Sequence, residues 1–470
     1  MKCCSLYLVI WGGAASVHAA EILVNDDSEA SLRAAIDGAS PGDVIKFGPA
    51  LSDETIRLNG GEITLSIDLT FDASELPEGL TISGENTGRV FQILNTATVV
   101  FDSIRITGGR TGSGGIGGGI LNNGGNLTLR RVTVSGNTSG DGMSDINGPG
   151  SPGGNGGGIY NSGTLTILDS TIMENQTGRG GMGSFLSGGP PGGNGAGIYN
   201  AGGFVTIENS TIANNVGGQG GNASTGGQGG SGGGIYNISS GTVTIRNSTI
   251  TGNESGPTGG PGTPGGEGGG IYNSSGTVNL SNSVVAENRL GDSGGLDVND
   301  GADIHPGEGT LNAIGPNLIG DNDQVDSIFP SSSRLVGTKA SPLSPNLAPL
   351  PNFSGSPPVR IPNVGSPVIE AGDNMQLSSD GLDQDEDNDF SELLPLDQRG
   401  LPRISGPNVD LGSVEDQLAY PALLAKKAKL RKQISAVQKL IKKAKRAKKK
   451  SKLKTLTRKL KKLKKQLSRL

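Results

Sequence analysis

The chain has 470 residues, of which 82 are Gly and 25 are Pro, and only 3% are aromatic. Glycine falls short of the one-third share with a strict period of three that collagen requires, and the scarcity of aromatic residues argues against a conventional large globular core. The net charge of −5 hides two opposed regions, because residues 421–470 hold 22 of the 39 basic residues and no acidic residue. The chain therefore combines an acidic body with a strongly basic tail.

Residues 1–20 have the pattern of a secretory signal peptide. Lys2 precedes an apolar run over 6–17, and the segment ends in the small residues Ala19 and Ala20. The run is shorter than the roughly 20 apolar residues that a membrane span needs. Cleavage would remove both cysteines and so exclude disulfides, cysteine nucleophiles and cysteine-based zinc sites. We expect an exported protein whose remaining histidine, in a loop-like Asp-Ile-His-Pro stretch, lies in a surface loop.

Five copies of one pattern recur through the middle of the chain. Each copy begins with two small residues, usually glycines, then Ile, then Tyr or Leu, then Asn. Each copy ends at a further Asn, and an aliphatic residue lies three positions before that Asn. The length from signature to closing Asn stays near 20 residues, so the variation in period falls in one Gly-rich loop. The isoleucines are Ile120, Ile159, Ile198, Ile235 and Ile271, and the closing asparagines are Asn137, Asn175, Asn215, Asn253 and Asn288.

Each copy contains three short strand patterns and no amphipathic helix. In one copy they fall at 158–161, 164–167 and 170–173, and alternation of period two is clear in the middle one. Parallel strands at a fixed repeat without crossover helices predict an all-β parallel β-helix, in which each copy is one coil. We expect the isoleucines to stack as an interior aliphatic column, and the asparagines to form a structural ladder at a corner.

The regions around the repeats complete the predicted organisation. Residues 21–300 form the β-helix, and a helical pattern at 31–39 is placed to cap its open end. Residues 301–420 contain degenerate coils and a Pro-rich C-terminal cap region. Residues 421–470 read as a Lys-rich amphipathic tail, either one long helix with a phase break or two helices. Its heptad-spaced apolar residues are Leu430, Ile434, Val437, Ile441, Leu453, Leu456, Leu460, Leu463, Leu467 and Leu470.

The repeat landmarks resemble the paired GGAI and FxxN repeats of polymorphic outer membrane proteins. Ser31-Leu-Arg-Ala-Ala-Ile36, with Pro41-Gly-Asp-Val-Ile-Lys-Phe47, is similar to the start of secreted bacterial β-helix proteins that carry a CSLREA-type domain. Asp397-Gln-Arg-Gly-Leu-Pro-Arg403, with Val409-Asp-Leu-Gly412 and Glu415, resembles the end of choice-of-anchor Q surface proteins. These resemblances imply a pectate-lyase-like, right-handed, single-stranded β-helix at a bacterial surface, and they imply no activity.

The acidic residues of the repeats do not form a recurring catalytic pair. Hydrolases of acidic polysaccharides need carboxylates that converge from neighbouring coils. Here the acids fall at unequal repeat positions, with no Arg or Lys in matched register beside a pair. They are Asp169, Glu174, Glu208, Glu254, Glu267 and Glu287. The pattern predicts no catalytic residue and favours a structural or adhesive role, with a polysaccharide lyase or glycoside hydrolase as the alternative.

Alternating carboxylates near the C-terminal end of the body indicate a candidate metal site. They are Asp383, Asp385, Asp387 and Asp389, and Glu392 could add a further oxygen. Calcium loops place oxygen ligands at alternate positions with Gly at the sixth and Glu at the twelfth. Asn388 and Leu394 occupy those two positions, so the match is partial. Calcium in a structural role is the one cofactor that the sequence suggests, and a solvated acidic loop is the alternative.

The basic tail requires an anionic partner, because it contains no acid to offset its own repulsion. Candidates are an anionic polymer of the cell surface, acidic phospholipid, nucleic acid and the acidic body of the protein itself. Nucleic acid ranks low, because the tail lacks aromatic residues for base stacking and the chain is exported. We therefore expect a secreted protein at the bacterial cell surface or outer membrane, held there by 421–470 and able to present a surface to a carbohydrate or cell-surface ligand.

Overall fold

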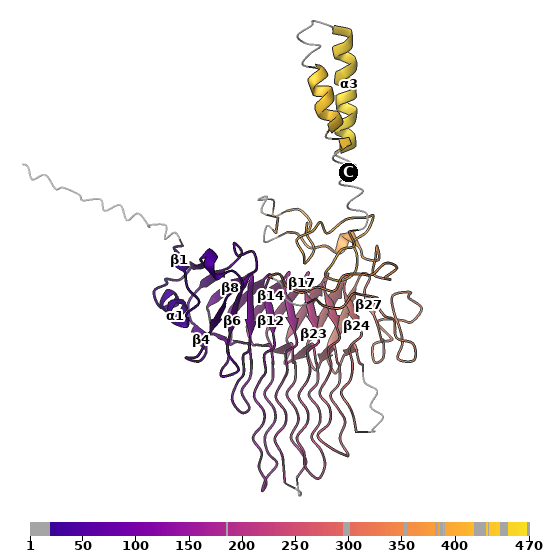
Figure 1. Ribbon diagram of the computed structural model, residues 1–470. Coiled ribbons are helices and arrows are strands. Elements are labelled where there is room, and N and C mark those ends of the chain that lie inside the picture. Colours follow the sequence, from indigo (N-terminus) through magenta and orange to yellow (C-terminus); the bar gives the residue numbers. More distant parts are fainter. Residues whose placement is uncertain are drawn as a thin grey trace, which may run out of the picture.

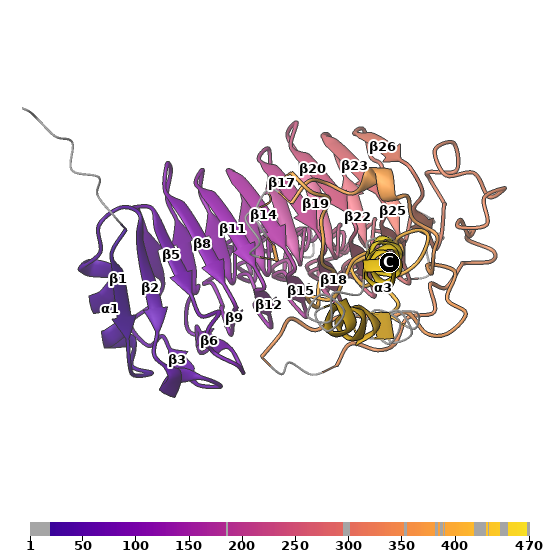
Figure 2. The ribbon, with the colours of Figure 1, turned by 90° about the horizontal axis from the view of Figure 1, so that it is seen from above.

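The computed structural model describes the body and most of the basic tail. Its described residues are 19–417 apart from 185–186, 295–300, 352–354, 381–383, 386–388 and 390, followed by 429–430, 432–441 and 450–467. Three all-parallel sheets of ten, nine and eight strands wind about one axis. Figures 1 and 2 show the coils stacked from the N-terminal end of the body toward its C-terminal end. The fold is the predicted right-handed, single-stranded parallel β-helix.

We name the ten-stranded sheet A, the nine-stranded sheet B and the eight-stranded sheet C. One coil passes through one strand of each sheet, in the order C, A, B, before the Gly-rich loop. Sheet A contains β1 Glu21–Val24, β2 Asp43–Phe47, β5 Leu69–Asp72, β8 Thr98–Asp102, β11 Asn126–Arg130, β14 Thr164–Leu168, β17 Phe204–Glu208, β20 Thr242–Arg246, β23 Thr277–Ser281 and β26 Thr310–Ile314. Sheet B contains β3 Thr55–Arg57, β6 Leu80–Ser83, β9 Ile104–Thr107, β12 Thr133–Ser135, β15 Thr171–Met173, β18 Thr211–Ala213, β21 Thr249–Thr251, β24 Val284–Ala286 and β27 Leu318–Ile319. Sheet C contains β4 Ile63–Leu65, β7 Phe91–Ile93, β10 Ile120–Asn122, β13 Ile159–Asn161, β16 Ile198–Ala201, β19 Ile235–Ile238, β22 Ile271–Asn273 and β25 Ile304–His305.

Aliphatic side chains from all three sheets fill the interior. In sheet C, the isoleucines of the repeat pair in direct register, Ile120 with Ile159, and so on through Ile198, Ile235 and Ile271. All five are fully buried. Burying each aliphatic side chain contributes about 1.5–3 kcal/mol, so the column is a main source of stability.

Buried asparagines form two columns at the corners of the coil. In both, the side-chain nitrogen of one residue donates to the side-chain oxygen of its equivalent in the next coil, at 2.7–2.9 Å. These bonds satisfy amides that have no access to water. The column after sheet B contains Asn137, Asn175, Asn215, Asn253 and Asn288 and ends on Asp303. The column after sheet C contains Asn122, Asn161, Asn200, Asn237 and Asn273.

Helix α1, Glu29–Asp37, lies at the N-terminal end of the coils (Figure 1). It begins two residues before the predicted 31–39, because the side chain of Ser28 accepts a hydrogen bond from Ser31 N and so caps the helix at an earlier position. Leu32 and Ala35 are buried in the same apolar cluster as the strands. The helix therefore covers the open end of the core.

A column of stacked aromatic rings runs along sheet C. Tyr160, Tyr199, Tyr236 and Tyr272 lie with successive ring centroids 5.1 Å apart, and His305 continues the stack at 5.0 Å. The expectation of a surface loop at His305 is therefore wrong. His305 pairs with Tyr272 in register, so sheet C continues through His305 despite the turn that the following proline favours.

The tail forms two helices that pack on each other. Residues 432–441 are helical, and α3 spans Lys450–Leu467. The apolar residues meet in a cluster made only of tail residues, with Ile434, Val437 and Leu463 buried at its centre and Leu430, Ile441, Leu456 and Leu460 around it. Residue 470 and the side chains of residues 453 and 467 lie outside the described part. Within the described residues, no helix has the length and apolar character required to cross a membrane.

The two short 3-10 helices lie outside the regular coils. The first, η1, spans Pro49–Leu51 and follows β2. The second, η2, spans Asn374–Gln376 and belongs to the segment that follows the last strand. We call the described residues of 342–417 in that segment the cap, because they bond to the outer face of sheet B.

Candidate functional site

The Gly-rich loops form an ordered plate, which we call the fin, from the described residues of 111–117, 138–157, 177–196, 216–233 and 255–269. Figure 1 shows these long loops extending side by side from one edge of the β-helix. Each loop has an outgoing and a return leg. Outgoing legs bond to the next outgoing leg, as Gly180 N does to Gln219 O at 2.8 Å, and return legs bond to return legs. The two layers are joined by bonds such as that from Gly230 N to Gly218 O, also 2.8 Å.

A period of three governs the legs. In the leg 217–222, Gly217 and Gly220 donate to the next outgoing leg, whereas Gly218 and Gly221 donate to the return layer. The third position, Gln219, lies on the outside of the layer and is partly exposed. Three residues per turn is the period of the polyproline II helix, whose backbone groups point outward and are free to bond to neighbouring chains. The fin is therefore a two-layer bundle of extended, glycine-rich legs.

The glycines of the fin are required by space. A Cβ atom at Gly218 would lie 1.9 Å from Gly178 O, and one at Gly230 would lie 1.8 Å from Gly193 O. No side chain fits at such a distance from a backbone carbonyl. The high glycine content therefore lets the legs pack together as a hydrogen-bonded plate. This role of the loops was not predicted from the sequence.

In its described part, the fin presents side chains at its outer positions and at its far end. At the far end, Met143, Ile146 and Met182 have exposed fractions of 64%, 78% and 54%. The loops carrying them are bonded together there, because Asp145 N donates to Met182 O at 2.9 Å. A group of exposed apolar residues on an ordered surface marks a contact site.

The cap attaches to a row of threonines on the outer face of sheet B. Thr171 Oγ1 donates to Pro358 O at 2.8 Å, and Thr211 Oγ1 donates to the side chain of Gln398 at 2.7 Å. In the next coil, Thr249 Oγ1 accepts from the backbone N–H of Ser413 at 3.1 Å. These bonds replace water on hydroxyls that the cap buries.

The residues that resemble the choice-of-anchor Q pattern meet in one buried cluster. Arg403 is fully buried and its Nη2 donates to the carbonyls of Asp410 and Gly412 at 3.1 and 2.7 Å. Glu415 N donates to Asp397 Oδ2 at 3.0 Å, and Asp410 N donates to Glu415 Oε2 at 2.9 Å. Burial raises the pKa of Glu415 to about 7. In this chain the pattern forms a clasp that closes the cap on itself and on sheet B.

Two acids of the sequence analysis are used to dock the cap. Asp169 lies at the sheet A–B corner with a left-handed φ of 50°, where later coils place Asn. Both its carboxylate oxygens accept from Gln384 Nε2 at 2.7 Å. Glu208, in the next coil, accepts a hydrogen bond from Ser378 Oγ. Burial raises the pKa of Asp169 to about 7 and also raises that of Glu208.

The remaining acids of the repeats are spread over the surface. Glu254 pairs with Arg289 at 3.5 Å, Glu267 approaches His305 at 3.9 Å, and Glu287 pairs with Arg360 at 2.8 Å. Glu174 lines a cavity between sheet B and the cap. The described acids of the repeats thus serve mainly as docking points and surface pairs.

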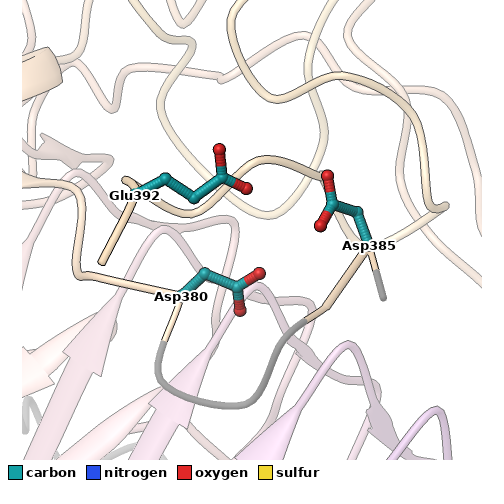
Figure 3. Close-up of side chains that lie close together, drawn as sticks. All are labelled: Asp380, Asp385 and Glu392. Atoms are coloured by element: carbon teal, nitrogen blue, oxygen red, sulfur yellow. The ribbon is translucent and has the colours of Figure 1, made fainter. Parts of the chain in front are cut away.

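Three carboxylates gather in the cap where calcium was predicted (Figure 3). Asp380, Asp385 and Glu392 place oxygen atoms within 4.8 Å of one another. Of the four predicted ligands, Asp385 belongs to this group, and Asp389 instead accepts from Ser391 N and Oγ at 3.1 and 2.6 Å. Residues 383 and 387 lie outside the described part. Oxygen donors suit a hard cation, and calcium at this group stays a prediction. Asp380, just before the alternating run of carboxylates, was not among the predicted ligands.

No protein-family model and no curated protein matches this chain. Among solved structures, the crystal structure of pectate lyase Pel9A is similar, with 14% sequence identity, 82% of this chain and 90% of that chain covered, and a TM-score of 0.32. The likeness is too weak to bear on activity. The resemblances to polymorphic outer membrane proteins and to the two surface-protein families therefore stay predictions.

We expect the folded protein to become more stable as the pH falls from 8 to about 5. Folding raises the pKa values of Asp169, Asp303 and Glu415 to about 7, from ordinary values of 3.8, 3.8 and 4.5. Such a group binds its proton more tightly when folded, so its contribution is complete below the ordinary pKa and is lost as the pH rises through the folded one. Between its ordinary pKa and its folded pKa, each group should change the free energy of unfolding by about 1.4 kcal/mol per pH unit.

Denaturant unfolding at a series of pH values measures this slope. The variant Asp169→Asn should have a shallower slope, because it removes one of the groups whose pKa folding raises. A free energy of unfolding that is constant or rises from pH 5 to 8 would contradict the prediction.

Proposed function

We propose that this protein is an exported structural or adhesive protein of the bacterial surface. In this proposal the β-helix is a stiff rod, the fin is the surface that it presents, and the basic tail holds it at an anionic component of the envelope. The observation that carries the proposal is the fin. Backbone hydrogen bonds between the glycine-rich legs of successive loops build a plate with exposed side chains, such as those of Met143 and Met182, at its far end. That architecture supports display and contact.

The arrangement of the acids supports the same function. A hydrolase needs two carboxylates that flank a bound sugar. Asp169 and Glu208 come from neighbouring coils, but their oxygens are engaged by the cap residues Gln384 and Ser378. Carboxylates used in this way stabilise the cap.

The basic tail supports retention at the envelope. Apolar residues of its described part, such as Ile434 and Leu463, pack on one another, and lysines such as Lys432, Lys459 and Lys462 are exposed. A surface with one sign of charge attracts anionic polymers through an interaction that salt screens. An anionic surface polymer is the partner that we favour.

We expect deletion of residues 421–470 to release the protein from cells into the medium. The whole chain, expressed with its own N-terminal segment in a bacterial host, should stay with the cell fraction at low salt and be released by high salt. Quantifying the protein in cells and medium by immunoblot measures the distribution.

The matched control replaces exposed lysines by glutamine at 459, 461 and 462, outside the apolar cluster of the tail. It should be released at a lower salt concentration than the parent. If the truncated protein stays bound to cells, the tail is not the anchor.

A further inference from the structure

The aromatic column on sheet C contains four tyrosines, which we call the tyrosine stack. Its members are Tyr160, Tyr199, Tyr236 and Tyr272, and each pairs in direct register with the next across neighbouring strands. Successive ring centroids lie 5.1 Å apart, and the planes of successive rings differ by 15°, 4° and 16°. Each ring therefore lies nearly flat against the next, and the register of the sheet fixes this arrangement.

The tyrosine stack is partly open to solvent. Tyr160, Tyr236 and Tyr272 are partly exposed, and Tyr199, which lies between the first two, is 9% exposed. The chain has six tyrosines, and the two that do not belong to the stack lie outside the described residues. The phenol groups of the described body are thus gathered in one row that an oxidant can reach.

No disulfide joins the coils of the β-helix. Both cysteines of the chain stand at positions 3 and 4, so residues 19–417 contain none. As disulfides show, a cross-link stabilises a fold mainly by limiting the freedom of the unfolded chain, and the gain grows with the length of the loop that it closes. Neighbouring tyrosines of the stack are 39, 37 and 36 residues apart. A bond between two of them would close a loop of one whole coil.

We propose that the tyrosine stack is a site of oxidative cross-linking, at which two neighbouring tyrosines couple to dityrosine and join successive coils. The oxidant is hydrogen peroxide, acting through a haem peroxidase. It takes one electron and one proton from each of two phenols and is reduced to two molecules of water. The two phenoxyl radicals then form one carbon–carbon bond between ring positions ortho to the oxygens. The hydrogen on each of these carbons moves to the oxygen of its ring, which restores both phenols.

The geometry of the stack favours coupling within one chain. Each radical has a partner ring in contact with it, whereas coupling between two chains needs a bimolecular encounter. The rings must turn about their side-chain bonds for the ortho carbons to meet, but the strands need not move, because the sheet already holds neighbouring tyrosines side by side. The site is independent of the proposed anchoring role, because it includes no residue of the tail.

Tyr199 needs no direct access to the peroxidase. A neighbouring ring that has been oxidised can take the electron and the proton of the Tyr199 hydroxyl and can then be oxidised again. Tyr160 and Tyr236 both stack on Tyr199, at 5.1 Å on either side. The buried member of the stack can therefore couple as readily as the others.

The test treats the dilute full chain with hydrogen peroxide and a haem peroxidase and detects dityrosine by its fluorescence. Free tyrosine in the same buffer is the positive control for the oxidant. After unfolding, a glutamate-specific protease separates the four tyrosines, because Glu174, Glu208 and Glu254 lie between them in the sequence. Mass spectrometry should find peptides of neighbouring coils joined with the loss of two hydrogen atoms. Denaturing electrophoresis should show that the product is still a single chain.

Two double variants with equal numbers of tyrosines test whether contact between the rings is required. Tyr160→Phe with Tyr272→Phe keeps the neighbouring pair at 199 and 236. Tyr199→Phe with Tyr236→Phe leaves two tyrosines with two coils between them. Phenylalanine retains the ring in the stack in both. The first variant should still form joined peptides, and the second should yield at least about tenfold less dityrosine. Treatment should also raise the urea midpoint of the first variant relative to that of the second.

Three results would each overturn the proposal. The first is an equal yield of dityrosine from the two double variants. The second is a product that joins different chains in place of neighbouring coils. The third is the absence of dityrosine from the folded chain under conditions in which free tyrosine couples.

Discussion

Replacing Gly230 by alanine should disrupt the fin and leave the β-helix folded. The new Cβ would lie 1.8 Å from Gly193 O and 2.7 Å from Gly193 C, both backbone atoms of the neighbouring return leg. The legs must separate, and the bond from Gly230 N to Gly218 O is then lost with its neighbours. Overpacking of this kind costs about 1–3 kcal/mol or more. Hydrogen exchange followed by mass spectrometry should show loss of amide protection across 177–233 and retained protection in the strands.

Gln228 offers the matched control for this change. It lies two residues before Gly230 in the same leg, and its side chain is exposed on the outside of the layer. Gln228→Ala should leave the protection of the whole fin unchanged. Equal effects of the two substitutions, or no loss of protection in Gly230→Ala, would show that the legs are not a close-packed bundle.

The interior of the β-helix was predictable because it repeats. Alternation of period two identifies the inward positions, and the constant spacing of the coil places Ile159 above Ile120 without knowledge of the fold's details. The same argument covers Asn175 and Asn137. Ser103 lies at the corner between sheets A and B in an earlier coil, at the position that Asp169 occupies later. Ser103 has a φ of 60°, and the chain turns there between β8 and β9.

The fin left a signal that the sequence analysis did not use. Glycine doublets recur three residues apart at 217–221 and 226–230, and this is the spacing of a leg with two packed sides. The cap left no such signal. Gln384 reaches Asp169 across 215 residues of chain, and neither segment repeats in step with the other. A contact of this kind depends on how the whole chain folds, so no repeat in the sequence indicates it.

Replacing Arg403 by methionine should release the cap from the β-helix. Arg403 is fully buried, and its charge is opposed by the carboxylates of Glu415, Asp397, Asp410 and Glu208. Methionine approximates its volume and removes the cation, so the buried carboxyls of Glu415 and Asp410 lose a compensating charge, whereas Asp397 keeps its ion pair with Arg399. Leaving a buried charge uncompensated costs about 3–5 kcal/mol. Limited proteolysis should cleave the variant within 342–417 under conditions that leave the parent intact.

The acids themselves determine how this defect depends on pH. Glu415 already has a pKa of about 7, and loss of the guanidinium should raise that pKa further. The variant should therefore be much less stable than the parent at pH 8 and closer to it at pH 5, where the carboxyl is neutral. Arg289→Met is the control, because Arg289 forms an exposed pair with Glu254 at 3.5 Å and such pairs contribute about 0–1 kcal/mol. If both variants have the stability of the parent at pH 8, the clasp does not hold the cap, and its attachment rests on the threonine row alone.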